Sequence, residues 1–239
     1  MKTTRLFTLL ALLMVFAMSC NKSDEPNNGG NEDDSLNNHE YVDLGLPSGT
    51  LWATCNVGAN TPEEFGDYFA WGETQPKSTY SWSNYQYCNG GNGGNTLTKY
   101  CTKTGNGYNG FTDYITTLLP EDDAATVNWG NDWCMPSKSQ WEELDQWTND
   151  TMIIQNGTKG LLLTASNGNS LFLPAAGRIY EDYFNNDYNG WYWSNTLLTE
   201  LPDCAWRLNF ISNIYNLGGL PRNYGHSIRP VRSQNNKRD

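Results

Sequence analysis

Short alternations of hydrophobic and polar residues run along most of this chain, and helical periodicity is sustained in few places. The segments EYVDLGL (40–46), TLWATCNVG (50–58) and DYFAWGE (67–73) each hold aromatic or β-branched residues between Gly, Pro and Asn. Apolar stretches with such punctuation are typical of short strands. We therefore expect the folded part of the chain to open with three β segments.

Two helices are predicted in the middle of the chain. Pro136 cannot continue a regular element, and Ser137 followed by Gln140 has the spacing of a capping box. A helix should therefore begin near Ser137, with Trp141 and Leu144 on its packed face. A second helix is expected over residues 120–129, where a proline and three acidic residues would occupy the first turn.

A three-stranded antiparallel meander should follow the helix that begins near Ser137. The apolar segments TMIIQ (151–155), KGLLLTAS (159–166) and NSLFLPAAG (169–177) are separated by Asn156-Gly157 and Asn167-Gly168. Asn-Gly pairs favour the tight turns of hairpins, because both residues tolerate positive φ.

The last third of the chain is rich in Asn, Tyr, Asp and Ser, which favour turns and exposed loops. In CAWRLNF (204–210), the alternation places Trp206, Leu208 and Phe210 on a packed face and leaves Arg207 and Asn209 on an accessible one. Tyrosine and tryptophan supply contact area at small entropic cost, while Asn supplies adaptable hydrogen bonds. We therefore predict a ligand-binding surface made of Tyr183, Asn185, Asp187, Tyr188, Asn189, Trp191, Tyr192, Arg207, Asn209, Asn213, Tyr215, Asn216, Asn223 and Tyr224.

The first residues predict a signal peptide over 1–19. Lys2 and Arg5 precede a short apolar run that ends in small residues before Cys20, and this arrangement resembles the lipobox of bacterial lipoproteins. Cys20 would then carry the lipid, although an ordinary cleaved signal remains an alternative. Residues 20–39 have almost no apolar side chains and should form a disordered tether. We expect one domain over 40–232 and a flexible tail over 233–239.

The net charge of the chain excludes some classes of binding partner. The sequence has 15 basic and 26 acidic residues, and removal of residues 1–19 takes away two of the basic ones, which leaves a formal charge of −13. This balance argues against nucleic acid and against electrostatic membrane binding, so the lipid would be the membrane contact. The acidic SDE after Cys20 resembles a signal for export to the outer face of the outer membrane; a solvated linker and a periplasmic position are the alternatives.

Cysteine spacing suggests one crosslink. Cys88 and Cys101 bracket a glycine-rich loop, and a disulfide between them would contribute about 3 kcal/mol by loop-closure entropy. The alternative is two reduced thiols. We expect no zinc site, because the chain has no CxxC pair and its two histidines, His39 and His226, are far apart in sequence.

Little in the sequence points to catalysis or to a metal. Asn185, Asp187 and Asn189 have the spacing of a calcium loop, but Thr196 stands where a bidentate Glu would be needed, so a plain turn is favoured. His226 has no nucleophile signature nearby, and a packed or surface histidine is favoured over a catalytic base. We expect neither enzymatic activity nor a cofactor.

Several segments together resemble a known family. YVDLGLPSGTLWATCNVGA, GDYFAWGE, GNSLFLPAAG, YWS and GHSIRPVR, together with the PEDDAA and MPS stretches before the central helix, are similar to the Fibrobacter succinogenes major paralogous domain of Bacteroidota lipoproteins. The resemblance covers nearly all of residues 40–232. It implies an α+β fold of the C-type-lectin-like kind shared with sulfatase-modifying factors, with two helices packed on twisted antiparallel sheet and long loops.

Departures from those relatives limit the function that the resemblance implies. The C-terminal cysteine pair that holds copper in formylglycine-generating members is missing here, since Cys204 is the last cysteine. The sugar motif EPN of calcium-dependent lectins occurs only at residues 25–27, inside the tether. We therefore expect a membrane-anchored, non-catalytic recognition module for a glycan or protein, and the Asn and Tyr scatter also fits a variable protein of a diversity-generating retroelement. A structural or adhesive envelope protein and an unrecognised enzyme are the alternatives.

Overall fold

The computed structural model describes residues 39–91, 93–185, 188–211 and 214–233. The predicted signal peptide, Cys20, most of the tether and most of the C-terminal tail lie outside these residues. Within the described residues, no helix has the length and apolar character needed to cross a membrane.

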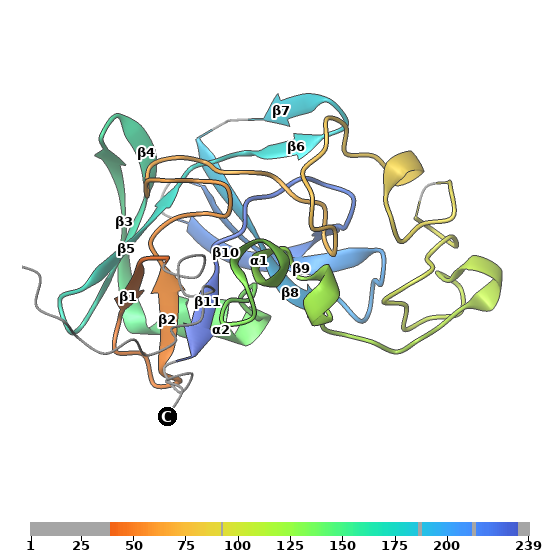
Figure 1. The fold of residues 1–239 in the computed structure, drawn as a ribbon, viewed down its shortest axis with the longest axis horizontal. Coiled ribbons are helices and arrows are strands. Elements are labelled where there is room, and N and C mark those ends of the chain that lie inside the picture. The colour runs from red at the N-terminus through yellow and green to blue at the C-terminus, as the bar shows by residue number, and fades with distance from the viewer. Residues whose placement is uncertain (1–38, 92, 186–187, 212–213, 234–239) are drawn as a thin grey trace, which may run out of the picture. The chain divides into compact units, whose positions relative to one another are not determined.

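Strands predominate, and two α-helices lie between the second and third of them (Figure 1). This composition agrees with the predicted α+β class. The elements are β1 (Tyr41–Asp43), β2 (Thr50–Ala53), α1 (Ala124–Trp129), α2 (Lys138–Trp147), β3 (Thr148–Gln155), β4 (Thr158–Ala165), β5 (Ser170–Pro174), β6 (Arg178–Tyr180), β7 (Tyr183–Asn185), β8 (Asn189–Leu197), β9 (Cys204–Ile211), β10 (Ile214–Pro221) and β11 (Val231–Ser233).

All strand pairs within the sheets are antiparallel. The described strands form sheets in the orders β1-β2-β11, β3-β4-β5, β6-β7 and β10-β9-β8. The β3-β4-β5 sheet confirms the predicted meander, and its first turn has φ of 46° at Asn156 and 86° at Gly157, the left-handed values that an Asn-Gly pair supplies.

Helix α2 begins as predicted. The Ser137 side chain accepts a hydrogen bond from the Gln140 N–H, and the Gln140 side chain accepts one from the Ser137 N–H. Trp141 and Leu144 are fully buried. The capping box therefore sets the start of a helix whose apolar face docks on the sheets.

The predicted helix over 120–129 is interrupted. A 3-10 turn covers Pro120–Asp122, and α1 starts only at Ala124. The interruption has a local cause, because the Asp123 carboxylate accepts from the backbone N–H groups of Thr126 and Met135 and so acts as the N-cap of α1.

The third predicted β segment, residues 67–73, is not a regular strand. Its one bridge joins Phe69 to His226, although Phe69, Ala70 and Trp71 are all buried. The apolar residues of this segment therefore predicted burial correctly, but the prediction of a strand was wrong. In the long segment between β2 and α1, drawn from orange to green in Figure 1, the helical elements of the described residues are short 3-10 turns.

The core consists of two hydrophobic clusters that meet at β8. Trp193 belongs to the cluster that contains Trp71 and Ile228, whereas its neighbour Tyr192 belongs to the cluster of Trp141 and Leu208. Successive side chains of a strand point to opposite faces, so β8 supplies one residue to each cluster in turn. The strand is thus covered on both faces.

The predicted Cys88–Cys101 disulfide is absent from this structure. Both residues are free thiols. The Cys88 Sγ lies 2.8 Å from the Thr96 Oγ1 and the Cys101 Sγ lies 3.1 Å from the Lys103 carbonyl oxygen. The segment between them is instead held by backbone hydrogen bonds between residues 87–89 and 96–98.

Truncation of the two tryptophans of α2 should separate its buried face from its exposed one. Trp141 is fully buried and Trp147 is 49% exposed. We expect Trp141→Ala to lower the free energy of unfolding by about 3–5 kcal/mol, and Trp147→Ala to change it by less than about 0.5 kcal/mol. Urea unfolding followed by fluorescence measures both, and equal losses would contradict the packing described above.

Candidate binding surface

The structure divides the predicted ligand-binding residues into exposed, half-buried and buried groups. Tyr183 and Tyr188 are 66% and 62% exposed, and Asn216 is also exposed. Asn185, Asn189, Tyr215 and Tyr224 are half-buried, whereas Trp191, Tyr192, Arg207, Asn209 and Asn223 are buried. Asp187 and Asn213 lie outside the described residues.

Several of the buried residues use their polar atoms inside the protein. Tyr192 is fully buried and donates its hydroxyl to the Pro174 carbonyl oxygen. Asn209 and Asn223 donate their side-chain amides to the carbonyl oxygens of Gly190 and Tyr80. These polar groups satisfy the interior backbone, which contradicts the prediction that their side chains are accessible.

The strand register places other predicted ligand-binding residues on opposite faces of the β8-β9-β10 sheet. Tyr215 lies on the same face of the β8-β9-β10 sheet as Tyr192, and its hydroxyl donates to the Trp141 carbonyl oxygen in α2. Tyr188 lies beside Lys159 of β4, whose Nζ is 5.2 Å from the ring centroid. Trp191, Arg207 and Asn209 occupy the opposite face from Tyr192. The predicted residues therefore do not form one continuous surface.

Two close approaches bring β6 beside this opposite face. The Gly177 N–H donates to the Asn189 carbonyl oxygen at 2.8 Å, which places the start of β6 against the start of β8. Ile179 and Gly225 exchange backbone hydrogen bonds of 2.8 and 2.9 Å. These contacts bring the side chains before and after Ile179 to the vicinity of Trp191 and Tyr224.

A stack of rings and guanidinium groups results, which we call the Arg–aromatic ladder: Tyr180, Tyr224, Arg178, Trp191 and Arg207. The Tyr180 and Tyr224 rings stack with centroids 4.6 Å apart. The Arg178 guanidinium carbon lies 5.3 Å from the Tyr224 centroid and 4.3 Å from the Trp191 centroid. The Arg207 guanidinium carbon lies 4.7 Å from the same indole ring. Such contacts are attractive cation–π geometries.

The sequence pointed to three residues of the ladder, Trp191, Arg207 and Tyr224, and missed Arg178 and Tyr180. The missed pair lies in GRIY, a stretch with no Asn-rich pattern. The only indication in the sequence was that Arg178 is an isolated arginine in a strongly acidic chain. Its neighbours can be identified only once β6 is placed beside β8.

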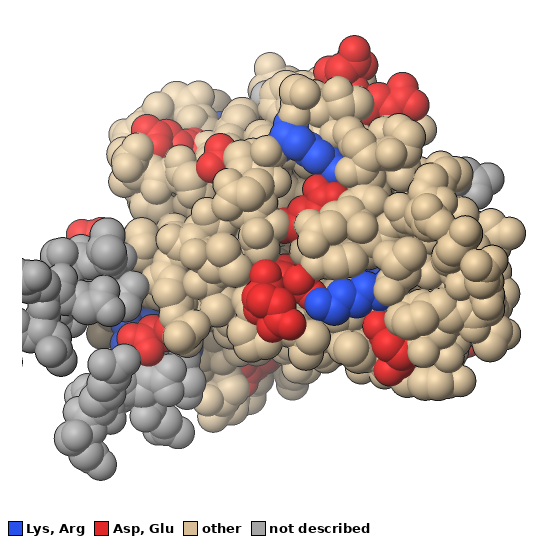
Figure 2. All heavy atoms as spheres, turned by 45° about the vertical axis from the view of Figure 1, so that its right-hand side comes forward, with Lys and Arg blue, Asp and Glu red and all other residues tan. Residues whose placement is uncertain are grey.

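Within the described residues, the ladder carries positive charge without a paired carboxylate. Ion pairs among the described residues all use lysine, for example Lys77 with Glu73 at 2.7 Å and Lys99 with Asp122 at 2.5 Å. On the face shown in Figure 2, patches of Lys and Arg lie beside patches of Asp and Glu. Burial, with a smaller contribution from Arg178, lowers the pKa of Arg207 to about 10.

His226 lies beneath the ladder. Its ring stacks on Trp193 with centroids 4.0 Å apart and is tilted against Trp191 at 5.7 Å. Both ring nitrogens are buried and have no hydrogen-bond partner among the described residues. Burial, followed by the charges of Arg207 and Arg178, holds the pKa of His226 well below its usual value. The imidazole is therefore neutral and supports the rings above it.

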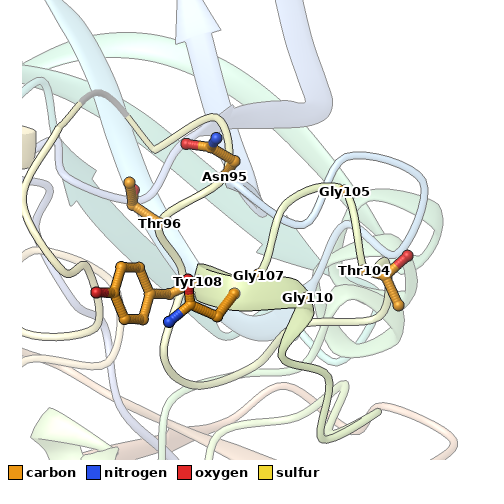
Figure 3. Close-up of a pocket in the computed structure, with 8 residues that line it drawn as sticks. Asn95, Thr96, Thr104, Gly105, Gly107, Tyr108 and Gly110 are labelled. Atoms are coloured by element: carbon orange, nitrogen blue, oxygen red, sulfur yellow. The ribbon is translucent and has the colours of Figure 1, made fainter.

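A separate surface pocket of about 410 Å³ lies in the irregular segment between β2 and α1. Figure 3 shows its two sides, with Asn95 and Thr96 on one stretch of chain and Thr104 to Gly110 on the other. Tyr108, which is 42% exposed, contributes its aromatic ring. None of the predicted ligand-binding residues lines this pocket.

Three residues of the calcium-like spacing are described, and they lie in two different strands. Asn185 ends β7, while Asn189 and Thr196 lie in the extended strand β8. Among the described residues, no group of three or more His, Cys, Asp or Glu side chains is placed to hold a metal ion.

No protein-family model, no curated protein and no solved structure matches this chain. The chemistry of the Arg–aromatic ladder therefore has to be judged from its own geometry.

The buried imidazole should make stability depend on pH. In the unfolded chain a histidine titrates near pH 6.5, whereas folded His226 resists protonation. As the pH falls below about 6.5, the unfolded state takes up the proton and the free energy of unfolding drops, by up to about 1.4 kcal/mol per pH unit. We expect His226→Phe, which keeps a ring against Trp193, to flatten this slope between pH 7 and 5.5 in urea titrations. Protonation of carboxylates is common to both proteins, so parallel curves would contradict the buried neutral histidine.

Proposed function

We propose that this chain is a non-catalytic recognition module, anchored by lipid at Cys20 to the outer membrane, that binds a glycan or protein ligand at the Arg–aromatic ladder. The observation that carries the proposal is the ladder itself. Two arginines stack on one indole without a carboxylate partner among the described residues, beside a tyrosine pair of which Tyr180 is 41% exposed. Arginine and aromatic side chains are the residues most often responsible for binding energy at recognition surfaces.

The surroundings of the ladder support the same proposal. Its members come from β6, β8, β9 and the turn after β10, so their positions are fixed by sheet hydrogen bonds rather than by a free loop. Preorganised side chains lose less entropy on binding. Exposed rings continue beyond it along the β6-β7 hairpin at Tyr183 and Phe184, which are 66% and 43% exposed.

We further propose that the domain has the C-type-lectin-like fold of the sulfatase-modifying-factor type and belongs with the Fibrobacter succinogenes major paralogous domain. Two helices, antiparallel sheets and a long irregular segment are compatible with that arrangement. Hypervariation at Asn209 and Asn223 would replace buried side chains that bond the backbone, which argues against a retroelement-diversified surface at those positions.

Truncation of one exposed ring tests the location of binding. We expect Tyr180→Ala in the full chain to weaken ligand capture at least about tenfold, because an aromatic side chain that dominates a recognition surface contributes about 2 kcal/mol or more. The assay is a screen of immobilised glycans and extracellular proteins, followed by titration of each ligand that binds. Circular dichroism should show an unchanged melting temperature.

Tyr108→Ala is the matched control, because Tyr108 is 42% exposed and lies in the separate pocket of Figure 3. Loss of capture in Tyr108→Ala alone would move the binding site to that pocket. Failure of every ligand in the screen to bind the unmodified chain would instead favour a structural or adhesive role.

A further inference from the structure

We propose that the ligand held at the Arg–aromatic ladder is an anionic saccharide, whose carboxylate or sulfate group binds at the guanidinium groups that flank Trp191, with half-buried Arg178 as the main contact. This inference rests on the proposed function and specifies the chemistry of the ligand.

The positive charges of the ladder are not balanced by ion pairs with the described residues. Arg178 and Arg207 lie against the same indole ring, at 4.3 and 4.7 Å, and Arg207 is only 9% exposed. Two like charges held close together and partly removed from water raise each other's energy. The described residues form no ion pair with either arginine. A bound anion would remove this repulsion and replace the lost hydration.

Hydrogen-bond donors of both guanidinium groups remain for such an anion. Arg207 Nη1 donates to the Asn216 backbone and side-chain oxygens, both at 3.2 Å, which fixes the plane of the group. Its Nε is buried and has no partner among the described residues, and its Nη2 forms no hydrogen bond to them. The half-buried Arg178 side chain has cation–π contacts with Trp191 and Tyr224 and forms no ion pair within the described part of the chain. A planar fork of donors matches the oxygens of a carboxylate or sulfate.

Gly218 leaves space beside the Arg207 fork. It faces Arg207 in the β9-β10 pair, and a Cβ placed on it would lie 3.5 Å from Nη2 and 3.6 Å from Nη1. A side chain at this position would therefore cover the donors. Glycine keeps the approach to the guanidinium group open.

The flanking residues favour a sugar over an acidic peptide. The stacked Tyr180 and Tyr224 rings offer an aromatic surface against which the C–H face of a pyranose packs, and the exposed Asn216 amide can bond hydroxyl groups. Glu181 and Asp182, both exposed, follow directly after Tyr180. Their charges repel a densely acidic chain and tolerate a ligand whose negative groups are isolated on otherwise neutral rings.

Matched saccharides test the inference on the intact protein. We would print sialylated, uronate-containing and sulfated oligosaccharides, each beside its neutral counterpart: desialylated, methyl-esterified or desulfated. We expect capture of anionic members only, with an affinity that falls as salt rises from 0.05 to about 0.5 M because the contact is charge-dependent. Binding by carboxylated members, sulfated members or both identifies which anion is recognised.

Substitution of Arg178 then locates the contact. Arg178→Gln removes the charge and should weaken capture at least about tenfold, since hydrogen bonds to charged groups contribute that much. Arg178→Lys keeps the charge without the planar fork and should retain more of the affinity than Arg178→Gln. Arg232→Gln is the matched control, because half-buried Arg232 also lies over two rings, Tyr41 at 5.4 Å and Trp133 at 5.5 Å, away from the ladder. It should bind like the unmodified protein.

Each alternative outcome is distinguishable. Capture of neutral saccharides or of a protein ligand that Tyr180→Ala weakens and Arg178→Gln does not would overturn the anion site and leave the recognition function intact. Equal capture of oligoglutamate and of the anionic saccharides would overturn the preference for a sugar. Absence of binding by every anionic saccharide would also refute the inference, while absence of any ligand at all would refute the proposed function itself.

Discussion

The two-sided burial of β8 is the constraint on which the rest of the structure depends. This strand alternates between two hydrophobic clusters, with Tyr192 in one and Trp193 in the other. Side chains from α2 therefore reach one face of the strand, and those around Trp71 and His226 reach the other. Because a shift by one residue would exchange every side chain between the clusters, the register of β8 is strongly specified. The positions of Trp191 and Arg207 follow from that register.

Buried cations are accommodated here by carbonyl oxygens instead of carboxylates. Arg229 is fully buried and bonds the Asn56 side chain and the carbonyl oxygens of Ala53 and Thr54, and burial lowers its pKa. Arg222, also fully buried, donates to the carbonyl oxygens of Lys99 and Tyr100. These arginines tie the C-terminal segment to distant loops. Arg178 of the ladder differs, because it is half-buried and lies over the rings of Trp191 and Tyr224.

Local signals in the sequence predicted local structure well, and composition predicted burial poorly. The Ser137 capping box and the Asn156-Gly157 turn act over a few residues, so their structures follow from chemistry within the pattern itself. Asn209 and Asn223 looked like surface residues by type, yet each bonds a carbonyl oxygen of a segment that the sequence could not bring near. The same long-range pairing hid Arg178, whose neighbours come from β8 and from the turn after β10. Residue type therefore predicts what a side chain can do, whereas strand pairing determines which side chains meet.

Burial makes part of the predicted surface inaccessible, and it also holds the remaining side chains of the ladder in fixed positions. A binding site made of free Asn and Tyr loops would have to order many side chains on each encounter, and each immobilised side chain costs about 0.5–1.5 kcal/mol. Trp191 is held by the sheet and by the tilted His226 ring beneath it, so both guanidinium groups rest on a fixed support. A rigid support keeps two like charges close when they would otherwise separate in solvent. The same packing that buries Tyr192 and Asn209 thus holds both guanidinium groups against Trp191, where the described residues offer neither of them an ion-pair partner.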